Sequence, residues 1–383
     1  MSNAGPSRQV RVLVVTNVGP TIIRAYLGPL ASLPEVEEVV VVRDQANVPP
    51  LRKIRLVTPP AWWPRGTVSK LPARGWLLRG EASNCPPDVV MTVHWFPDGP
   101  GAVRLAQRLG VPFIGNIVGS RAELICGGRR VALSALPSWV KSLAEEYQRA
   151  YLNQASALTF TGGATRAWFQ AAEVRRPHLS VLHAAMASDR LRPGGGPRTL
   201  DIAFIGRLDP DKRIDRLLRV LAAIGRRRGG TAVALIGVSE DRVARLPEYA
   251  AARSALGEGL RLLEWVSDVG EVLRSAKLLL VTSDTEGRTL SVLEAMLCGT
   301  VPVVTDVGDL REALADGEAG ILVPVKGGEN TLVGCMADAA CALLDEEPRR
   351  ASLALRAEAH ARREHDPRRT AEEWRSVLNA VGL

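Results

Sequence analysis

The feature that most constrains the fold of this chain is the repetition of short apolar runs separated by helical patterns. The first run, "VRVLVVT", is continuous, as expected of a parallel strand that is buried on both faces. Similar runs recur at residues 36–42, 89–93, 111–117, 157–161 and 179–182, with helical patterns at 102–109 and 139–152. This alternation predicts an α/β fold with a doubly wound parallel sheet.

A Pro/Gly-rich stretch, "RPGGGPRT", interrupts the alternation, which then starts again. The second series begins with "DIAFIG" and continues with runs at 232–236, 260–263, 278–281, 301–305 and 320–323. We therefore expect two Rossmann-like domains that face a central cleft, at residues 1–190 and 200–360, with a linker at 191–199. A terminal helix at 361–383 has no strand of its own and is expected to pack back toward the first domain.

Composition excludes several classes of protein. With 46% hydrophobic and 23% charged residues, the chain resembles an ordinary globular protein, and its 383 residues suit two domains. No apolar run approaches the roughly 20 residues of a membrane span, and we expect no signal peptide. The five cysteines are odd in number and form no Cys-x-x-Cys pair. Disulfide frameworks and metal ribbons are thus not expected, and the cytoplasm is the favoured location.

Residues 45–80 form a basic and aromatic segment. This stretch contains no acidic residue, and Trp62, Trp63 and Trp76 are interleaved with seven lysines and arginines. Such a segment suits an anionic small molecule or an anionic membrane surface. The plain alternative is an ordered loop whose tryptophans are packed. The formal net charge of +8 comes largely from arginine and is weak evidence for nucleic-acid binding, which we do not expect.

The strand "DIAFIG" leads into "RLDPDKRIDRLL", which favours a phosphate site. Gly206 permits close approach of the backbone, and Arg207 and Lys212 follow before the next helix begins. Two cations beside a helix start can neutralise a diphosphate, which the free N–H groups can also bond. The alternative is that these cations are solvated beside Asp209 and Asp211.

The stretch "TSDTEGRTLSVLEAMLCG" holds two glutamates with different surroundings. Glu286 precedes an expected helix, where a sugar hydroxyl suits it better than a phosphate would, and Gly287 allows a tight turn. Thr289 can cap that helix, whose first N–H groups form an anion site. Glu294 lies inside the apolar helix and needs hydrogen-bond donors. These donors would be the two hydroxyls of a ribose or an internal arginine.

Residues 201–323 resemble the nucleotide-binding domain of the family 4 retaining glycosyltransferases, which have the GT-B fold. The resemblance is carried by "GRLDPDK", the two glutamates seven residues apart, "LEAMLCGTVPVVTDVGDL" and "DGEAGILVP". It implies that Arg207 and Lys212 hold the donor diphosphate, that Glu286 contacts the donor sugar and that Glu294 binds the ribose. It also implies backbone contacts to the donor from Gly287, Arg288, Thr289 and Leu290.

The amino-terminal half resembles the family more faintly. "DVVMTVHWFPDG" matches a strand that ends in a donor-contacting histidine, which makes His94 the candidate; a structural histidine is the alternative. "NVGP" replaces the family's Gly-Gly loop near the donor phosphate, and only Gly19 remains. "VGSRAEL" resembles a loop at the cleft and supplies Ser120. Because acceptors bind in this half of the fold, Trp62, Trp63 and Ser120 are the acceptor-side candidates.

The resemblance predicts a glycosyltransferase that moves a sugar from a nucleoside diphosphate to an acceptor with retention of configuration. The acceptor would be a small molecule, as in antibiotic biosynthesis and other secondary metabolism, or a lipid or polysaccharide precursor at the inner membrane face. Two competing hypotheses are a nucleotide-sugar epimerase and a non-catalytic binding protein. The spacing in "HARREH" fits no zinc signature and no P-loop is present. We expect neither a metal nor a further cofactor, and the oligomeric state stays open.

Overall fold

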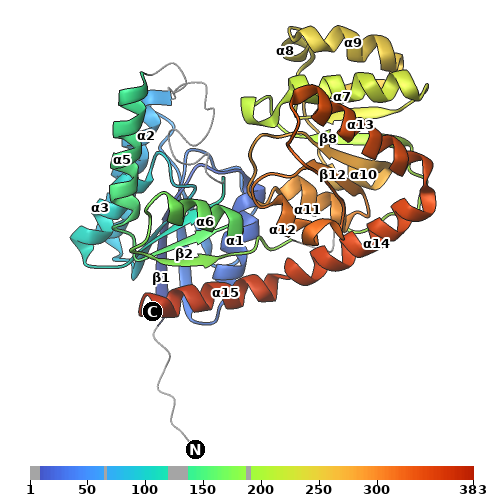
Figure 1. Cartoon of the computed structure of the whole chain (residues 1–383). Helices are drawn as coiled ribbons and strands as arrows, with labels where there is room; N and C mark the ends of the chain where they lie inside the picture. Colours follow the sequence, from blue (N-terminus) through green and yellow to red (C-terminus); the bar gives the residue numbers. More distant parts are fainter. Residues whose placement is uncertain (1–8, 64–66, 120–136, 187–190) are drawn as a thin grey trace, which may run out of the picture. The chain divides into compact units, whose positions relative to one another are not determined.

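The computed structural model describes residues 9–63, 67–119, 137–186 and 191–383. The chain forms two compact units (Figure 1). The N-terminal unit contains the described residues up to Ala185 together with His365–Leu383, and the C-terminal unit contains Met186–Glu364. The last segment of the chain therefore belongs to the unit in which the chain began.

The N-terminal unit is built on a seven-stranded sheet in the order β3-β2-β1-β4-β5-β6-β7, and all its paired strands are parallel. The strands are β1 Val10–Val15, β2 Val36–Val42, β3 Ile54–Val57, β4 Val89–Val93, β5 Phe113–Ile117, β6 Ala157–Phe160 and β7 His178–Val181. Its described helices are α1 Pro20–Ser32, α2 Thr67–Asn84, α3 Gly99–Leu109, α5 Ser138–Leu152, α6 Gly163–Ala171 and α15 Pro367–Ala380.

The C-terminal unit has a six-stranded parallel sheet in the order β10-β9-β8-β11-β12-β13. The strands are β8 Leu200–Ile205, β9 Val233–Ile236, β10 Leu260–Leu263, β11 Ala276–Val281, β12 Val301–Thr305 and β13 Ile321–Val323. The helices include α7 Ile214–Arg227, α8 Glu240–Val243, α9 Pro247–Leu256, α10 Val269–Ser275, α11 Leu290–Leu297, α12 Leu310–Ala313, α13 Glu329–Asp345 and α14 Glu347–Glu364. The prediction of two doubly wound parallel sheets is confirmed.

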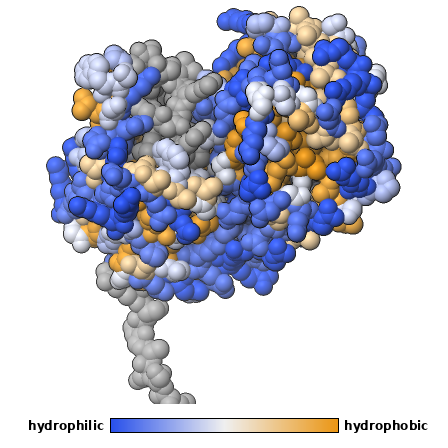
Figure 2. Space-filling model, in the orientation of Figure 1, coloured by the Kyte–Doolittle hydropathy of each residue, from blue (hydrophilic) through white to orange (hydrophobic). Residues whose placement is uncertain are grey.

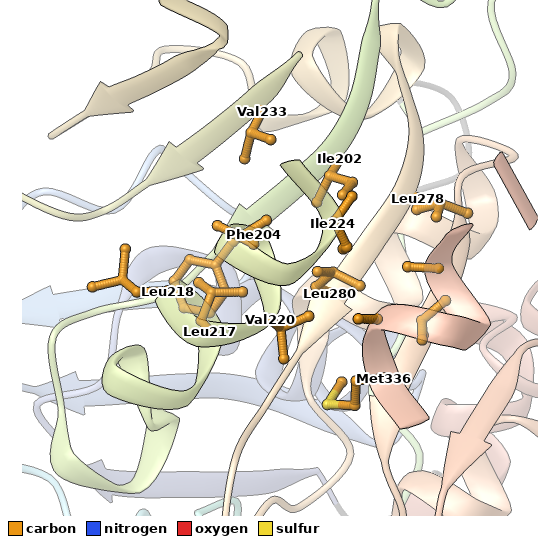
Figure 3. Packing of buried hydrophobic residues seen from close by; sticks show 14 of the residues in the cluster. Ile202, Phe204, Leu217, Leu218, Val220, Ile224, Val233, Leu278, Leu280 and Met336 are labelled. Atoms are coloured by element: carbon orange, nitrogen blue, oxygen red, sulfur yellow. The ribbon is translucent and has the colours of Figure 1, made fainter. Parts of the chain in front are cut away.

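Helix α7 shows why the C-terminal sheet is buried. Its apolar residues recur with the helical period, and Leu217, Val220 and Ile224 are fully buried (Figure 3). They pack in one cluster with Ile202 and Phe204 of β8. Each such side chain contributes about 1.5–3 kcal/mol on burial. The sheet is therefore stabilised by packing against its own helices, and polar residues can occupy the ends of its strands.

Strand order reverses between β8 and β11, because the chain moves from β8 out to β10 and then returns to pair β11 with β8. In open α/β sheets, ligands bind outside the carboxyl ends of the strands at such a reversal. The face seen in Figure 2 is largely hydrophilic, and hydrophobic residues gather on the C-terminal unit. No helix among the described residues is long and apolar enough to cross a bilayer.

Helix α15 completes the N-terminal unit by packing against α1. Trp374 is fully buried there, and its Nε1 donates a hydrogen bond of 2.7 Å to the carbonyl oxygen of Tyr26. His183 donates its backbone N–H to Glu373 at 2.7 Å, which fixes the same helix to the segment that follows β7. The final helix is thus a structural part of the first unit.

Candidate functional site

The loop between β11 and α11 forms a polar cradle around Glu286. This carboxylate is only 6% exposed, yet it is fully paired. Lys212 Nζ lies 2.5 Å from Oε1, and Ser283 Oγ donates to the same oxygen at 2.6 Å. Thr289 Oγ1 donates to Oε2. Lys212 follows β8, so the sequence candidates Lys212 and Glu286 meet where the strand order reverses.

Thr289 is the N-cap residue of α11, as its position in the sequence suggests. Its side chain accepts no hydrogen bond from the helix, because its hydroxyl is turned to Glu286. The expectation that Thr289 caps the helix is therefore confirmed in its position, but its side chain makes no capping hydrogen bond. Thr289 instead orients the carboxylate, and Leu290 begins the helix directly after it.

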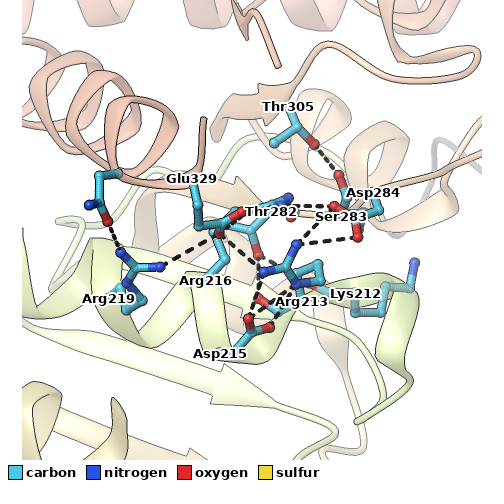
Figure 4. A network of polar contacts seen from close by, with 11 residues as sticks. Lys212, Arg213, Asp215, Arg216, Arg219, Thr282, Ser283, Asp284, Thr305 and Glu329 are labelled. Carbon is cyan, nitrogen blue, oxygen red and sulfur yellow. Dashed lines mark hydrogen bonds and ion pairs between the residues drawn. The ribbon is translucent and has the colours of Figure 1, made fainter. Parts of the chain in front are cut away.

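A network of ion pairs centred on one buried arginine holds this loop beside the turn that carries Lys212 (Figure 4). Arg216 is 2% exposed and donates to the carbonyl oxygen of Thr282 at 2.7 Å and to Asp284 at 2.8 Å. Arg213 has a left-handed φ of 51° and bonds to Asp284 at 3.1 Å. Glu329, at the start of α13, accepts from Arg216 at 2.7 Å. The network fixes the loop geometry without using the groups at Glu286.

The end of β12 and the chain that follows it also support the loop. The backbone N–H of Asp309 donates to the carbonyl oxygen of Glu286 at 3.3 Å, and Thr305 Oγ1 donates to the carbonyl oxygen of Ser283 at 2.7 Å. Gly308 has φ of 56°, and a Cβ atom there would lie 1.8 Å from the Glu286 carbonyl oxygen. Only glycine fits at this position.

Glu294 lies in the second turn of α11, the helix that follows the Glu286 loop. Among the described residues, no side chain forms a hydrogen bond or ion pair with its carboxylate, so an internal arginine does not supply the donors. Burial raises the pKa of Glu294 to about 7. Such a carboxyl group is ready to accept hydrogen bonds from a ligand.

The remaining donor-side candidates are arranged differently. Arg207 follows β8, but its side chain is 85% exposed and pairs with Asp209 at 2.8 Å. The Arg288 side chain is buried and pairs with Glu312 at 2.5 Å, so only its backbone is left for a ligand. Gly206 donates its N–H to Ile236 at the end of β9. Gly287 is buried within the loop.

In the N-terminal unit, the candidates lie at separate strand ends. His94 follows β4 with a left-handed φ of 73°, and its Nδ1 lies 2.9 Å from the carbonyl oxygen of Phe96. Gly19 is the N-cap of α1, and a Cβ atom there would meet nothing within 4 Å. Trp62 is 73% exposed, while Trp63 stacks on Trp76 with ring centroids 6.0 Å apart. Ser120 lies outside the described residues.

The two sequence halves match two related family models. The description "Glycosyl transferase 4-like domain" matches residues 1–185, and "Glycosyl transferases group 1" matches residues 199–346. Both halves of the chain thus belong to glycosyltransferase families of the GT4 type. The resemblance expected from the sequence is thereby confirmed. No group of three or more possible metal ligands occurs among the described residues of this glycosyltransferase.

Curated relatives carry a related name. The chain is 34% identical over 182 residues to a D-inositol 3-phosphate glycosyltransferase of Nocardia farcinica, an alignment that spans 46% of this chain and 39% of the relative. It is 27% identical to the enzyme of that name from Frankia alni, over 78% of this chain and 76% of the relative. The chain thus spans well under half of the Nocardia relative.

Solved structures agree with the fold of this glycosyltransferase. Sucrose-phosphate synthase from Thermosynechococcus elongatus has a TM-score of 0.76, with 16% identity over 97% of this chain and 98% of that one. Anabaena HepE in complex with UDP and glucose has a TM-score of 0.73, with 15% identity over 97% of this chain and 100% of that one. These are GT-B glycosyltransferases, and the likeness shows that this chain has the same fold.

Sequence reasoning missed the groups that hold the site in place. Ser283 supplies a hydroxyl to Glu286, and Arg216 ties the loop to the helix after β8. The clearest available signal was Gly308 in "DVGDL", since a glycine in the loop just beyond a buried strand often marks a close backbone approach.

Gly308→Ala should disturb the Glu286 loop of this glycosyltransferase. The added Cβ would collide with the carbonyl oxygen of Glu286, and overpacking of this kind costs about 1–3 kcal/mol. Gly328→Ala is the matched control, because φ there is also positive, at 88°, but nothing lies within 4 Å of an added Cβ. Thermal unfolding should show the larger loss in Gly308→Ala. Equal losses of thermal stability in the two variants would mean that backbone strain at a positive φ, and not the collision with Glu286, causes the loss.

Proposed function

We propose that this glycosyltransferase moves a sugar from a nucleoside diphosphate to an acceptor with retention of anomeric configuration. The observation that carries the proposal is the pair of Lys212 and Glu286 at the reversal between β8 and β11. A buried carboxylate held by two hydroxyl donors and an adjacent ammonium offers one group, the carboxylate, to sugar hydroxyls and one, the ammonium, to a phosphate.

The chemistry follows from the charges. Departure of the nucleoside diphosphate builds negative charge on its phosphate oxygens, and Lys212 and the first N–H groups of α11 would stabilise it. Arg207 is exposed and would reach the diphosphate only after leaving Asp209. The acceptor attacks on the face that the diphosphate leaves, and a leaving phosphate oxygen takes the acceptor proton. No covalent enzyme intermediate is needed.

The proposal also names a class of donor and a class of acceptor. HepE has been solved with UDP-glucose, which supports a UDP-sugar as the first donor to test. The curated relatives are named for D-inositol 3-phosphate, which supports a small hydroxyl-bearing acceptor. In its most specific form, the proposal is that this acceptor is a compound of secondary metabolism. Exposed Trp62 and the stacked Trp63 are our acceptor-side residues.

The direct test supplies the purified chain with UDP-sugars, ranked by their effect on the melting temperature, and with small polyol acceptors. Transfer with the donor's anomeric configuration in the product supports the proposal. An inverted product, or a donor converted to its epimer without transfer, would show a different reaction. A donor that binds and is never consumed, with any acceptor or with water, would make this chain a binding protein.

His94→Ala and Glu286→Gln should each lower turnover by roughly ten- to a thousandfold, because both residues are proposed to position the transferred sugar. Affinity for the nucleoside diphosphate without its sugar should change little. Steady-state kinetics and nucleotide titration on the same preparations measure both quantities. Equal losses of turnover and nucleotide affinity would contradict this division of roles.

A further inference from the structure

The N-terminal unit has a pocket of about 250 Å³ between α2 and α3. It begins at Asp98, directly before α3, and extends to Arg108 in the last turn of that helix. An 11-residue helix is about 16 Å long. The pocket therefore extends along α3, away from the strand end near His94, and contains none of the candidate donor residues.

The floor and walls of the pocket have an apolar part. Leu78 of α2 and Leu105 of α3 line it from the two helices. Gly75 and Gly101 lie on the same two helices, and a Cβ atom added at either would meet nothing within 4 Å. The space between the helices is thus kept open by two residues that have no side chain.

Three arginines line the same pocket. Arg79 comes from α2, and Arg104 and Arg108 come from α3. Within the part of the chain that the structure describes, none of the three forms an ion pair. Arg104 is held in place, because its guanidinium carbon lies 5.1 Å from the centre of the Tyr151 ring. Unpaired guanidiniums around a small cavity suit an anion with several oxygen atoms.

The one acidic side chain in the pocket offsets only part of this positive charge. Asp98 pairs with Arg74 at 3.0 Å, and Arg74 also pairs with Asp44 at 2.6 Å. The two carboxylates share a single buried guanidinium. Asp44, Asp98 and Arg74 together carry one net negative charge. The three pocket arginines outnumber it, so the pocket has a net positive charge.

We propose that this pocket binds an organic phosphate monoester. The phosphate would be held by Arg79, Arg104 and Arg108, and a short apolar arm would lie against Leu78 and Leu105. A phosphate monoester has the double charge and the three terminal oxygens that three guanidiniums can bond. Pockets for drug-sized ligands measure about 300–1,000 Å³, so this ligand is small. The site lies outside the proposed donor residues and does not depend on the proposed transfer reaction.

The test uses the full chain and butyl phosphate, with butanol and inorganic phosphate as partial ligands. Melting temperature is followed against ligand concentration, since a ligand that binds only the folded state raises it. Arg104→Gln should weaken butyl phosphate binding by about tenfold or more, the effect of losing one charge-assisted hydrogen bond. Gly101→Leu should abolish binding by filling the cavity.

Matched variants separate the pocket from general effects. Gly80→Leu lies on α2 outside the pocket, also with open space around it, and Arg226→Gln removes an exposed charge from the C-terminal unit. Both should keep full binding, and Lys212→Ala should keep it too. Absence of binding in the unaltered chain, or loss of binding in Lys212→Ala with retention in Gly101→Leu, would overturn the proposal.

A second set of binding measurements distinguishes a lipid headgroup from a water-soluble phosphate ester as the natural ligand. Phosphatidylcholine vesicles with and without phosphatidic acid are compared with butyl phosphate on the same variants. Vesicle binding that needs phosphatidic acid and is lost in Gly101→Leu would identify a lipid headgroup. Butyl phosphate binding without vesicle binding would identify a water-soluble ester.

Discussion

Lys212→Ala is expected to lower kcat/KM for the donor by the equivalent of about 1.5–3 kcal/mol, on the scale of one charged hydrogen bond. Two losses combine in this variant. The diphosphate loses a cation, and Glu286 loses the ammonium that lies 2.5 Å from it. A buried carboxylate without that partner would also repel the incoming diphosphate.

The double variant Lys212→Ala with Glu286→Gln separates these two losses. Removing the carboxylate charge should restore part of the nucleotide affinity that Lys212→Ala loses, but turnover should stay low. Lys277→Ala is the control, because Lys277 pairs with Asp201 at 2.7 Å at the amino-terminal end of β11. Arg207→Ala should lower kcat/KM for the donor by as much as Lys212→Ala does, or by less. An unchanged kcat/KM in Lys212→Ala, with the fold intact, would refute the assignment of Lys212.

Glu294→Gln is expected to stabilise the folded chain at alkaline pH and to weaken nucleoside diphosphate binding. Burial holds the pKa of Glu294 at about 7 in the folded chain, against an ordinary value of 4.5. Between these values the folded state binds more protons than the unfolded state, so ionisation of Glu294 costs stability as pH rises. The penalty is absent below pH 4.5 and complete above pH 7, where it reaches about 3 kcal/mol.

Melting temperatures at pH 5 and pH 8 measure this penalty. Glu294→Gln should gain stability relative to the unaltered chain as pH rises, whereas Glu271→Gln, on an exposed position of α10, should not. Calorimetry with UDP should show weaker binding to Glu294→Gln, because the ribose hydroxyls lose their ionised acceptor. Binding to the unaltered chain should also weaken below pH 7 more than binding to the variant. Equal UDP affinity in both proteins would make Glu294 a structural acid.

The regular part of the fold could be predicted from the sequence because buried parallel strands are continuous apolar runs. Strand β1 is such a case, and α11 is the apolar helix that the sequence predicts after Glu286. Strand β3 was missed, since "IRLV" has only four residues, none of them fully buried. Helix α2 was missed because Pro72 and Gly75 interrupt a weak helical pattern in the basic segment.

The candidate site could be predicted in its residues and only partly in its geometry. Lys212 and Glu286 were found separately, 74 positions apart, and no local pattern states that their side chains meet. The same holds for Arg216 with Glu329, which are 113 positions apart. Such contacts depend on which strands become neighbours, and strand order is a property of the whole sheet.

The return of α15 to the N-terminal unit has a consequence for the order of folding during synthesis. Met186–Glu364, about 180 residues, separates α15 from the rest of its unit, and at about 5–20 residues per second a ribosome needs roughly 10–40 s to make them. During that interval, the face of α1 that later covers Trp374 is exposed to water. The second unit can therefore complete its core first, and the nascent first unit is the part that needs protection by chaperones until the last helix emerges.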